Sequence, residues 1–153
     1  MFSDLNTAPA GSEKPDGPDM HSIIADFLDM GLVENMVSLC KQEPEQIAVS
    51  AALVGDERLR VRLGLAVLFE ELQGCCADDL TRAVPVLMRY CSHAEPWARG
   101  DAASLLASIN SPEVLPVLQS MQNDPSPQVA ALIRDLLQPA SHAGHFRRGW
   151  LTC

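Results

Sequence analysis

The chain has 153 residues, of which 47% are hydrophobic, so we expect one globular core and not two independent domains. Residues 1–55 hold nine acids and two lysines (−7), residues 56–137 hold eleven acids and seven arginines (−4), and the remainder carries two arginines (+2). A chain this acidic repels a phosphate backbone, so no nucleic-acid partner is expected. No window approaches 18 consecutive apolar residues, which argues against a membrane partner and for a soluble, cytoplasmic protein.

The first part of the chain divides into a polar lead and three helices. Residues 1–18 are rich in Pro, Gly, Ser and Asp and lack the segments of a secretion signal, so we predict a disordered N-terminal lead. Asp19 is a suitable N-cap for a helix that Gly31 ends. Apolar residues of helical period then predict a second helix over 32–40 and a third over 44–55, with Pro44 in its first turn.

An internal repeat organises the rest of the chain. The pattern of residues 56–72 recurs in 96–109 at an offset of 37 and in 124–137 at a further offset of 31, and the extra residues fall in a predicted loop over 73–78. A two-helix unit of this length cannot bury its apolar face alone, so neighbouring units must stack. We therefore predict an all-α fold, a right-handed α-α superhelix of about seven helices over residues 19–138.

The segment after the repeats has no period. Residues 139–153 mix Gly, His, Arg and two aromatic residues, and Pro139 breaks the helical pattern. We predict an irregular C-terminal tail, which is either a mobile end or a short docking segment.

The repeated residues resemble the HEAT repeat, especially the short bacterial HEAT-like repeat of phycocyanobilin lyase subunits. The likeness covers about residues 32–137. Arg62 and Arg99 stand where the family often has an arginine, but the last copy has Ala130, which implies a ladder of polar pairs that ends before the final helix. The resemblance implies a protein-binding solenoid. Its alternatives are an accessory subunit of a lyase or other cofactor-handling enzyme and, less favoured, a DNA-binding module.

No catalytic or cofactor-binding motif is present in the sequence. A Ser/His/Asp order, a Gly-rich phosphate loop and an HExxH motif are all absent, so we predict no enzyme, no catalytic residue and no cofactor. Cys40 and Cys91 are predicted to be buried as small apolar residues, whereas a redox role is an alternative for Cys75 and Cys76 in the predicted loop. No metal site is predicted, because the spacing of the three potential ligands in the tail matches no standard site: His142, His145 and Cys153.

The predicted partner-binding face follows from the register of the repeats. In a helical solenoid the second helix of each pair lines the concave side. The outward positions of these helices define the candidate face, to which Ala51 and Ala52 add small side chains: Glu45, Arg82, Met88, Arg89, Glu113, Gln119 and Ser120. Mixed charge beside a methionine suits a protein or peptide better than a phosphate backbone. We therefore predict a noncatalytic adaptor or regulatory protein with a protein partner of unknown identity.

Individual residues outside this face are expected to stabilise the stack. Trp97 is predicted to pack on the preceding loop, with a partner anchor as the alternative. Asp101 is predicted to bond backbone or an arginine of an adjacent repeat. Arg58, Arg60 and Arg62 cannot share one helix face, so we expect solvated ends or bonds between repeats. The apolar stripe of the first helix offers a surface for a weak homodimer: Met20, Ile23, Ile24 and Phe27.

Overall fold

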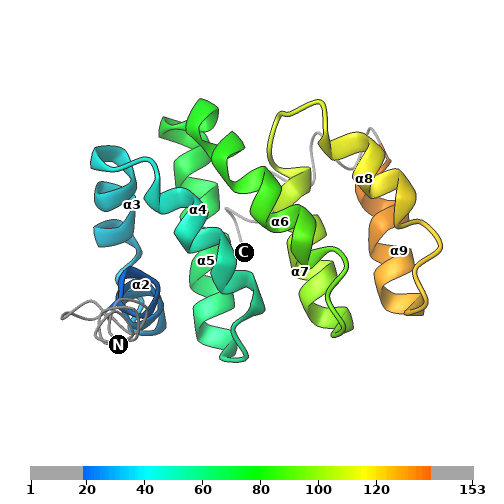
Figure 1. The fold of residues 1–153 in the computed structure, drawn as a ribbon, viewed down its shortest axis with the longest axis horizontal. Helices are drawn as coiled ribbons and strands as arrows, with labels where there is room; N and C mark the ends of the chain where they lie inside the picture. Colours follow the sequence, from blue (N-terminus) through cyan, green and yellow to red (C-terminus); the bar gives the residue numbers. More distant parts are fainter. Residues whose placement is uncertain (1–18, 139–153) are drawn as a thin grey trace, which may run out of the picture.

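The computed structural model describes residues 19–138 as a stack of helices (Figure 1). These residues form eight α-helices, two 3-10 helices and no strand: α2 (Met20–Asp29), α3 (Val33–Gln42), α4 (Gln46–Ala51), η1 (Ala52–Gly55), α5 (Leu59–Cys75), η2 (Ala77–Ala83), α6 (Val84–Tyr90), α7 (Pro96–Ala107), α8 (Val114–Ser120) and α9 (Pro127–Leu136). The predicted all-α solenoid is confirmed, with eight α-helices in the described residues instead of about seven. The right-handed sense of the superhelix and the domain limits stay predictions, and the predicted lead and tail lie outside the described residues.

The helices form two layers (Figure 1). We call α2, α3, α5, α7 and α9 the first-helix layer, and α4, α6 and α8 the second-helix layer. Within the first layer α2 and α3 both pack on α5, and α7 packs on α9. Between the layers α7 packs on α6 and α8. The successive pairs therefore share one continuous core, as the repeat length required.

The first layer begins with two short helices because Gly31 separates them. The Asp19 carboxylate accepts a hydrogen bond from the Ser22 N–H at 2.9 Å, which caps α2 as predicted. Gly31 adopts a φ of 80°, a conformation that costs glycine little, and the chain then turns into α3. Close packing of α2 on α5 depends on Gly64, where an added Cβ would lie 3.1 Å from the Leu28 carbonyl oxygen.

The later first helices begin at the spacing that the repeat predicts. They start at Leu59, Pro96 and Pro127, which are separated by 37 and 31 residues. The same turn precedes each start, because one side chain accepts the N–H two residues later: Asp56 from Arg58 at 2.8 Å, His93 from Glu95 at 3.0 Å and Asp124 from Ser126 at 2.9 Å. Each hairpin thus carries its own local start signal.

The extra residues after α5 do not form the predicted loop. Residues 73–75 continue α5, and η2 follows almost at once. Leu72 is fully buried, and the Gln73 side-chain amide donates to the Ser108 carbonyl at the end of α7. The insertion therefore lengthens α5 along its neighbour, because the added turn finds a hydrogen-bond partner there.

The core runs the length of the stack and includes residues predicted to be exposed. Ile24 is fully buried, and Met20 and Phe27 pack against the core. The apolar stripe of α2 therefore contributes to the core, while Met20, Ile23 and Phe27 stay partly exposed, and the weak homodimer stays a prediction. Cys40 is buried as predicted, and burial raises its thiol pKa to about 11. Cys91 is only half-buried, yet it packs against the core and burial likewise raises its pKa to about 11.

Candidate functional site

The residues of the predicted partner-binding face are all exposed in the structure. Glu45 and Glu113 occupy equivalent places, one residue before α4 and α8. They are 68 residues apart, which is the sum of the two repeat offsets, 37 and 31. The others come from three elements of the second-helix layer: Arg82 from η2, Met88 and Arg89 from α6, and Gln119 and Ser120 from α8. One neighbour was wrongly predicted, because Ala51 is fully buried. Ala51 lies four residues after Ile47 in α4, and both side chains are fully buried on the same helix face.

The charges of this face are only partly paired. Arg82 lies 3.5 Å from Asp79, but Arg89 forms no ion pair with any residue in 19–138. Glu113 accepts a hydrogen bond from the Ser111 hydroxyl, and this bond lowers its pKa. Met88 is 36% exposed, and Leu115, which sequence reasoning missed, is 54% exposed. The second-helix face therefore combines an unpaired arginine with exposed apolar side chains, a composition typical of protein interfaces.

A second surface, of which sequence reasoning considered only Trp97, lies on the first-helix layer. Leu59 and Leu63 of α5 are 58% and 55% exposed and face Trp97 of α7 across a groove of about 240 Å³. We call this the Trp97 groove; Leu105 and Ser104 of α7 also line it. Leu59 and Leu63 are four residues apart, so the sequence indicates that they share one face of α5. It does not show that α7 leaves this face uncovered.

The wall of the Trp97 groove holds an arginine, an aromatic ring and a carboxylate. The Arg62 guanidinium lies 4.3 Å from the centre of the Trp97 ring, and its Nη1 is 3.5 Å from Asp101 Oδ2. Arg62 Nε is buried and has no hydrogen-bond partner among the described residues. Burial raises the pKa of Asp101, and the Arg62 charge only partly opposes that rise. The prediction that Asp101 meets an arginine of an adjacent repeat is confirmed.

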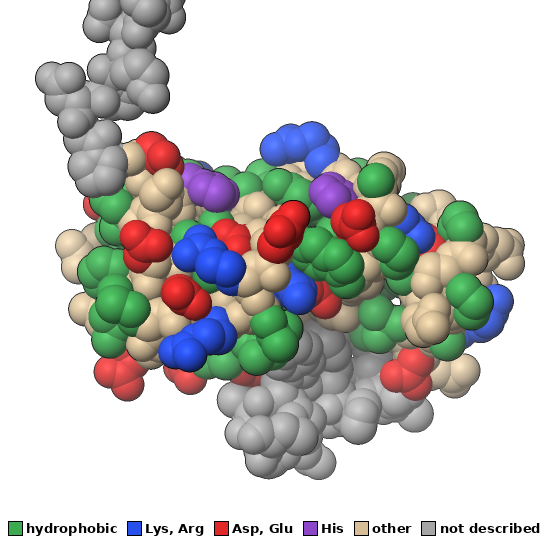
Figure 2. Space-filling view, turned by 90° about the horizontal axis from the view of Figure 1, so that it is seen from below, with side chains coloured by type: hydrophobic (Ala, Val, Ile, Leu, Met, Phe, Trp, Pro, Cys, Tyr) green, Lys and Arg blue, Asp and Glu red, His purple; other side chains and the backbone are tan. Residues whose placement is uncertain are grey.

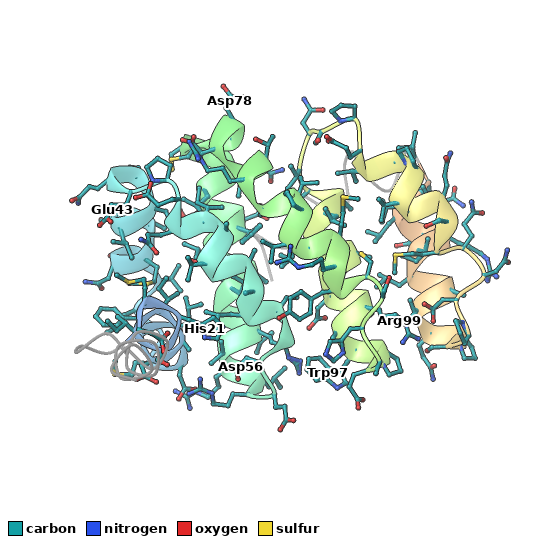
Figure 3. The ribbon with its side chains drawn as sticks, viewed as in Figure 1. His21, Glu43, Asp56, Asp78, Trp97 and Arg99 are labelled. Carbon is teal, nitrogen blue, oxygen red and sulfur yellow. The ribbon has the colours of Figure 1, made fainter. Side chains whose placement is uncertain are left out.

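Trp97 also borders a second depression on its other side. This depression lies between α7 and α9 and includes Gly100 and Leu132. Figure 3 places Trp97 on the same edge of the stack as Asp56 and Arg99, where the first helices begin. The His93 ring lies 6.3 Å from the Trp97 ring, so Trp97 contacts the preceding loop, as predicted, while it still borders open surface.

The polar pairs along this edge connect neighbouring repeats. Arg99 forms two short bonds with Asp124, from Nε at 2.8 Å and from Nη2 at 2.7 Å, and also donates to the His93 carbonyl at 2.9 Å. The Arg99 side chain lowers the pKa of Asp124. At the other end Arg58 contacts Asp26, and Arg60 lies 3.7 Å from Asp29. The predicted bonds between repeats are therefore present, and the ladder ends at Ala130, which is buried.

Charged side chains along this edge alternate in sign. In Figure 2, which views the edge directly, Lys and Arg side chains lie beside Asp and Glu side chains. Residues 19–138 hold 17 acidic side chains and eight Lys or Arg, a net charge of −9. The face that Figure 2 shows carries no continuous basic surface among the described residues, such as a phosphate backbone would require.

The described residues give no support to the alternative redox role of Cys75 and Cys76. Cys75 is the last residue of α5, not a loop residue, and its Sγ lies 3.2 Å from Sγ of Cys76. Burial, followed by the contact with Cys75, raises the pKa of Cys76, which disfavours the reactive thiolate. Within residues 19–138 no three His, Cys, Asp or Glu side chains converge as a metal site. His142, His145 and Cys153 lie outside the described residues.

The comparisons with known proteins agree with this geometry. The sequence profile of the family described as HEAT repeats matches residues 51–138, more than half of the chain. The chain is a HEAT-repeat protein. Searches of curated proteins and of solved structures give no match. HEAT repeats commonly serve as noncatalytic protein-interaction scaffolds, and in this HEAT-repeat protein none of the helices over residues 19–138 is long and apolar enough to cross a membrane.

Proposed function

We propose that this HEAT-repeat protein is a noncatalytic adaptor or regulatory module that binds a protein partner on its second-helix face. The proposal rests on two neighbouring exposed residues of α6, Met88 and Arg89. Arg89 has no ion-pair partner in residues 19–138. Methionine and arginine are enriched at interfaces, and an unpaired arginine favours an acidic or carbonyl-rich partner surface. The exposed Leu115 side chain on α8 extends the apolar part of this face.

The remaining residues of the face set its polar rim. Five exposed residues add polar side chains of both charges to the face: Glu45, Arg82, Glu113, Gln119 and Ser120. Such a rim contributes more to partner choice and association rate than to affinity. The unpaired thiols among the described residues suit the reducing cytoplasm, where we expect the protein to act.

The proposal disfavours a cofactor-handling role. An accessory subunit of a lyase needs a pocket for its pigment or cofactor, and neither Cys75 nor Cys76 lines the grooves described above. The acidic charge of residues 19–138 likewise disfavours DNA.

Affinity capture with matched charge-reversal variants tests the proposed face. The immobilised full chain and its Arg89→Glu variant are exposed to the same extract, and retained proteins are quantified by mass spectrometry. We expect Arg89→Glu to reduce the retention of the specific partner by about tenfold. Arg134→Glu is the control, because Arg134 is also exposed and makes the same charge change on α9. Equal loss with Arg134→Glu, or turnover of a small substrate by the purified chain, would refute the proposal.

A further inference from the structure

The Trp97 groove is an apolar surface that the described residues leave uncovered. Leu59, Leu63 and Trp97 expose apolar area on a layer that the proposed partner face does not use. A groove lined in this way binds bulky apolar side chains, and a single aromatic residue fills a space of this size.

We propose that the chain's own residues 146–151 occupy the Trp97 groove, with Trp150 as the side chain that enters it. This segment, Phe-Arg-Arg-Gly-Trp-Leu, places three bulky apolar residues around two arginines. It differs in charge from the rest of the chain, since residues 139–153 carry +2 and residues 19–138 carry −9. The inference does not depend on the proposed partner face, which lies on the other layer.

Charge favours this occupant at the groove itself. Asp101 lines the groove and its side chain is 46% exposed. Burial raises the pKa of Asp101, and the charge of Arg62 opposes this rise only in part. Arg62 lies 3.5 Å from the carboxylate and also contacts the Trp97 ring. A second cation from the open side stabilises the Asp101 carboxylate, and Arg147 and Arg148 immediately precede the Gly149-Trp150 pair.

The segment is long enough to reach the groove. The ten-residue helix α9 runs about 15 Å away from the edge where Trp97 lies, and two interhelical spacings of about 10 Å each separate it from α5. The direct path back to the groove is therefore about 25 Å. The twelve residues from 139 to 150 span up to about 40 Å when extended.

Covalent attachment favours this segment over a second copy of the chain. A tethered segment has an effective concentration on the order of 1 mM, so a groove with a Kd of about 1 mM for the free segment is already about half occupied. A second copy at micromolar concentration competes about a thousandfold less well.

The experiment uses fluorine NMR of the full chain labelled with 5-fluorotryptophan. The sequence contains two tryptophans, so the spectrum has two signals, and Trp150→Phe assigns them. We expect the Trp150 signal of the native chain to lie away from its position in urea. Leu63→Glu should move it to the urea position, while Leu115→Glu, a control of equal exposure on the other layer, should leave it unchanged. Far-UV circular dichroism confirms that each variant keeps its helices.

Trypsin cleavage after Arg147 and Arg148 supplies a second readout. We expect cleavage to be several-fold faster in Leu63→Glu than in the native chain or in Leu115→Glu. A Trp150 signal that already lies at its urea position in the native chain would overturn the inference. So would an equal response to Leu115→Glu, or a Trp150 shift that disappears on dilution, because dilution dependence would show that the segment occupies the groove of a second copy.

Discussion

The junction between α7 and α9 and the junction between α5 and α7 share one register but end in different structures. In the first, Arg99 bonds Asp124 in a nearly buried pair. In the second, the counterpart of Asp124 at an offset of 31 is His93, so Arg62 turns to Trp97 and to a more distant Asp101. The acceptor at one position thus decides whether the arginine connects two turns or faces a groove.

A second pair of counterparts reinforces this difference. Gly100 of α7 lies where α5 has Leu63, and an added Cβ at Gly100 would lie 3.4 Å from Leu132 of α9. Because no long side chain stands at this position, α9 approaches α7 and the two helices pack directly. At the α5–α7 junction the Leu63 side chain stands in the corresponding place, 55% exposed, and lines the Trp97 groove. Small and charged residues bring α7 and α9 together beside the depression that Trp97 borders, whereas a large apolar residue and a histidine leave the Trp97 groove between α5 and α7.

Removal of the carboxylate charge should separate the two junctions most sharply. We expect Asp124→Asn to lower the free energy of unfolding by about 3 kcal/mol, because it leaves the nearly buried Arg99 without its partner. Asp101→Asn should change it by less than about 0.5 kcal/mol, since burial already opposes the charge at Asp101. Urea unfolding followed by circular dichroism measures both. Equal losses in the two variants would contradict the comparison.

Acid should remove the difference between Asp124→Asn and the native chain. Arg99 lowers the folded-state pKa of Asp124, so the stability that this carboxylate contributes is fully present above its unfolded pKa of about 3.9. That contribution is lost as the pH falls through the lower folded-state value. Unfolding of both chains between pH 7 and pH 2 should therefore converge at the acid end. A deficit that persists unchanged at pH 2 would show that packing, not charge, causes it.

A carboxylate at position 93 should give Arg62 an ion-pair partner across the junction between α5 and α7. We expect His93→Asp to raise the free energy of unfolding by about 1 kcal/mol, because Arg62 gains the partner that its counterpart Arg99 has. In the native chain the Glu95 N–H donates to the His93 ring, and a carboxylate at position 93 can accept the same bond. Thermal unfolding measures the gain, and Arg62→Ala in the same background should abolish it. A loss of stability in His93→Asp would mean that the Tyr90–His93 ring stacking matters more.

Alanine at two glycines should have opposite effects of smaller size. Gly100→Ala should stabilise by about 0.5 kcal/mol, since its Cβ would meet Leu132 at an ordinary contact distance and alanine favours helix. Gly64→Ala should destabilise the chain, because its Cβ would lie 3.1 Å from the Leu28 carbonyl oxygen and backbone cannot move aside cheaply. Thermal unfolding of both variants measures these changes in stability. A stabilising effect of Gly64→Ala would contradict the packing described for α2 on α5.

The sequence predicts the repeat register well because its signals are local. The offsets of 37 and 31 place the starts of α5, α7 and α9 correctly, and Asp19 and Gly31 bound α2 as expected. Capping residues and proline act within a few residues of themselves, so their meaning does not depend on the rest of the fold. The expected bond between Asp101 and an arginine followed from the same register.

The candidate surfaces are harder to predict because they depend on distances between helices. Ala51 was misplaced because the register equates it with the exposed Met88 and Gln119, whereas it shares the buried face of α4 with Ile47. The Trp97 groove was missed because Leu63 is an apolar residue of an amphipathic helix, and an adjacent helix normally covers such residues. Only the arrangement of α5 relative to α7 shows that this side chain is 55% exposed.

The three capping turns at Asp56, His93 and Asp124 have a consequence for how the chain acquires its structure. Each turn is completed by a bond between residues two apart, so we expect it to form before distant contacts do. Any hairpin can therefore nucleate first, and growth then spreads outward in either direction along the array. A chain assembled in this way has several entry routes to its native state, and loss of one turn delays a single route without closing the others.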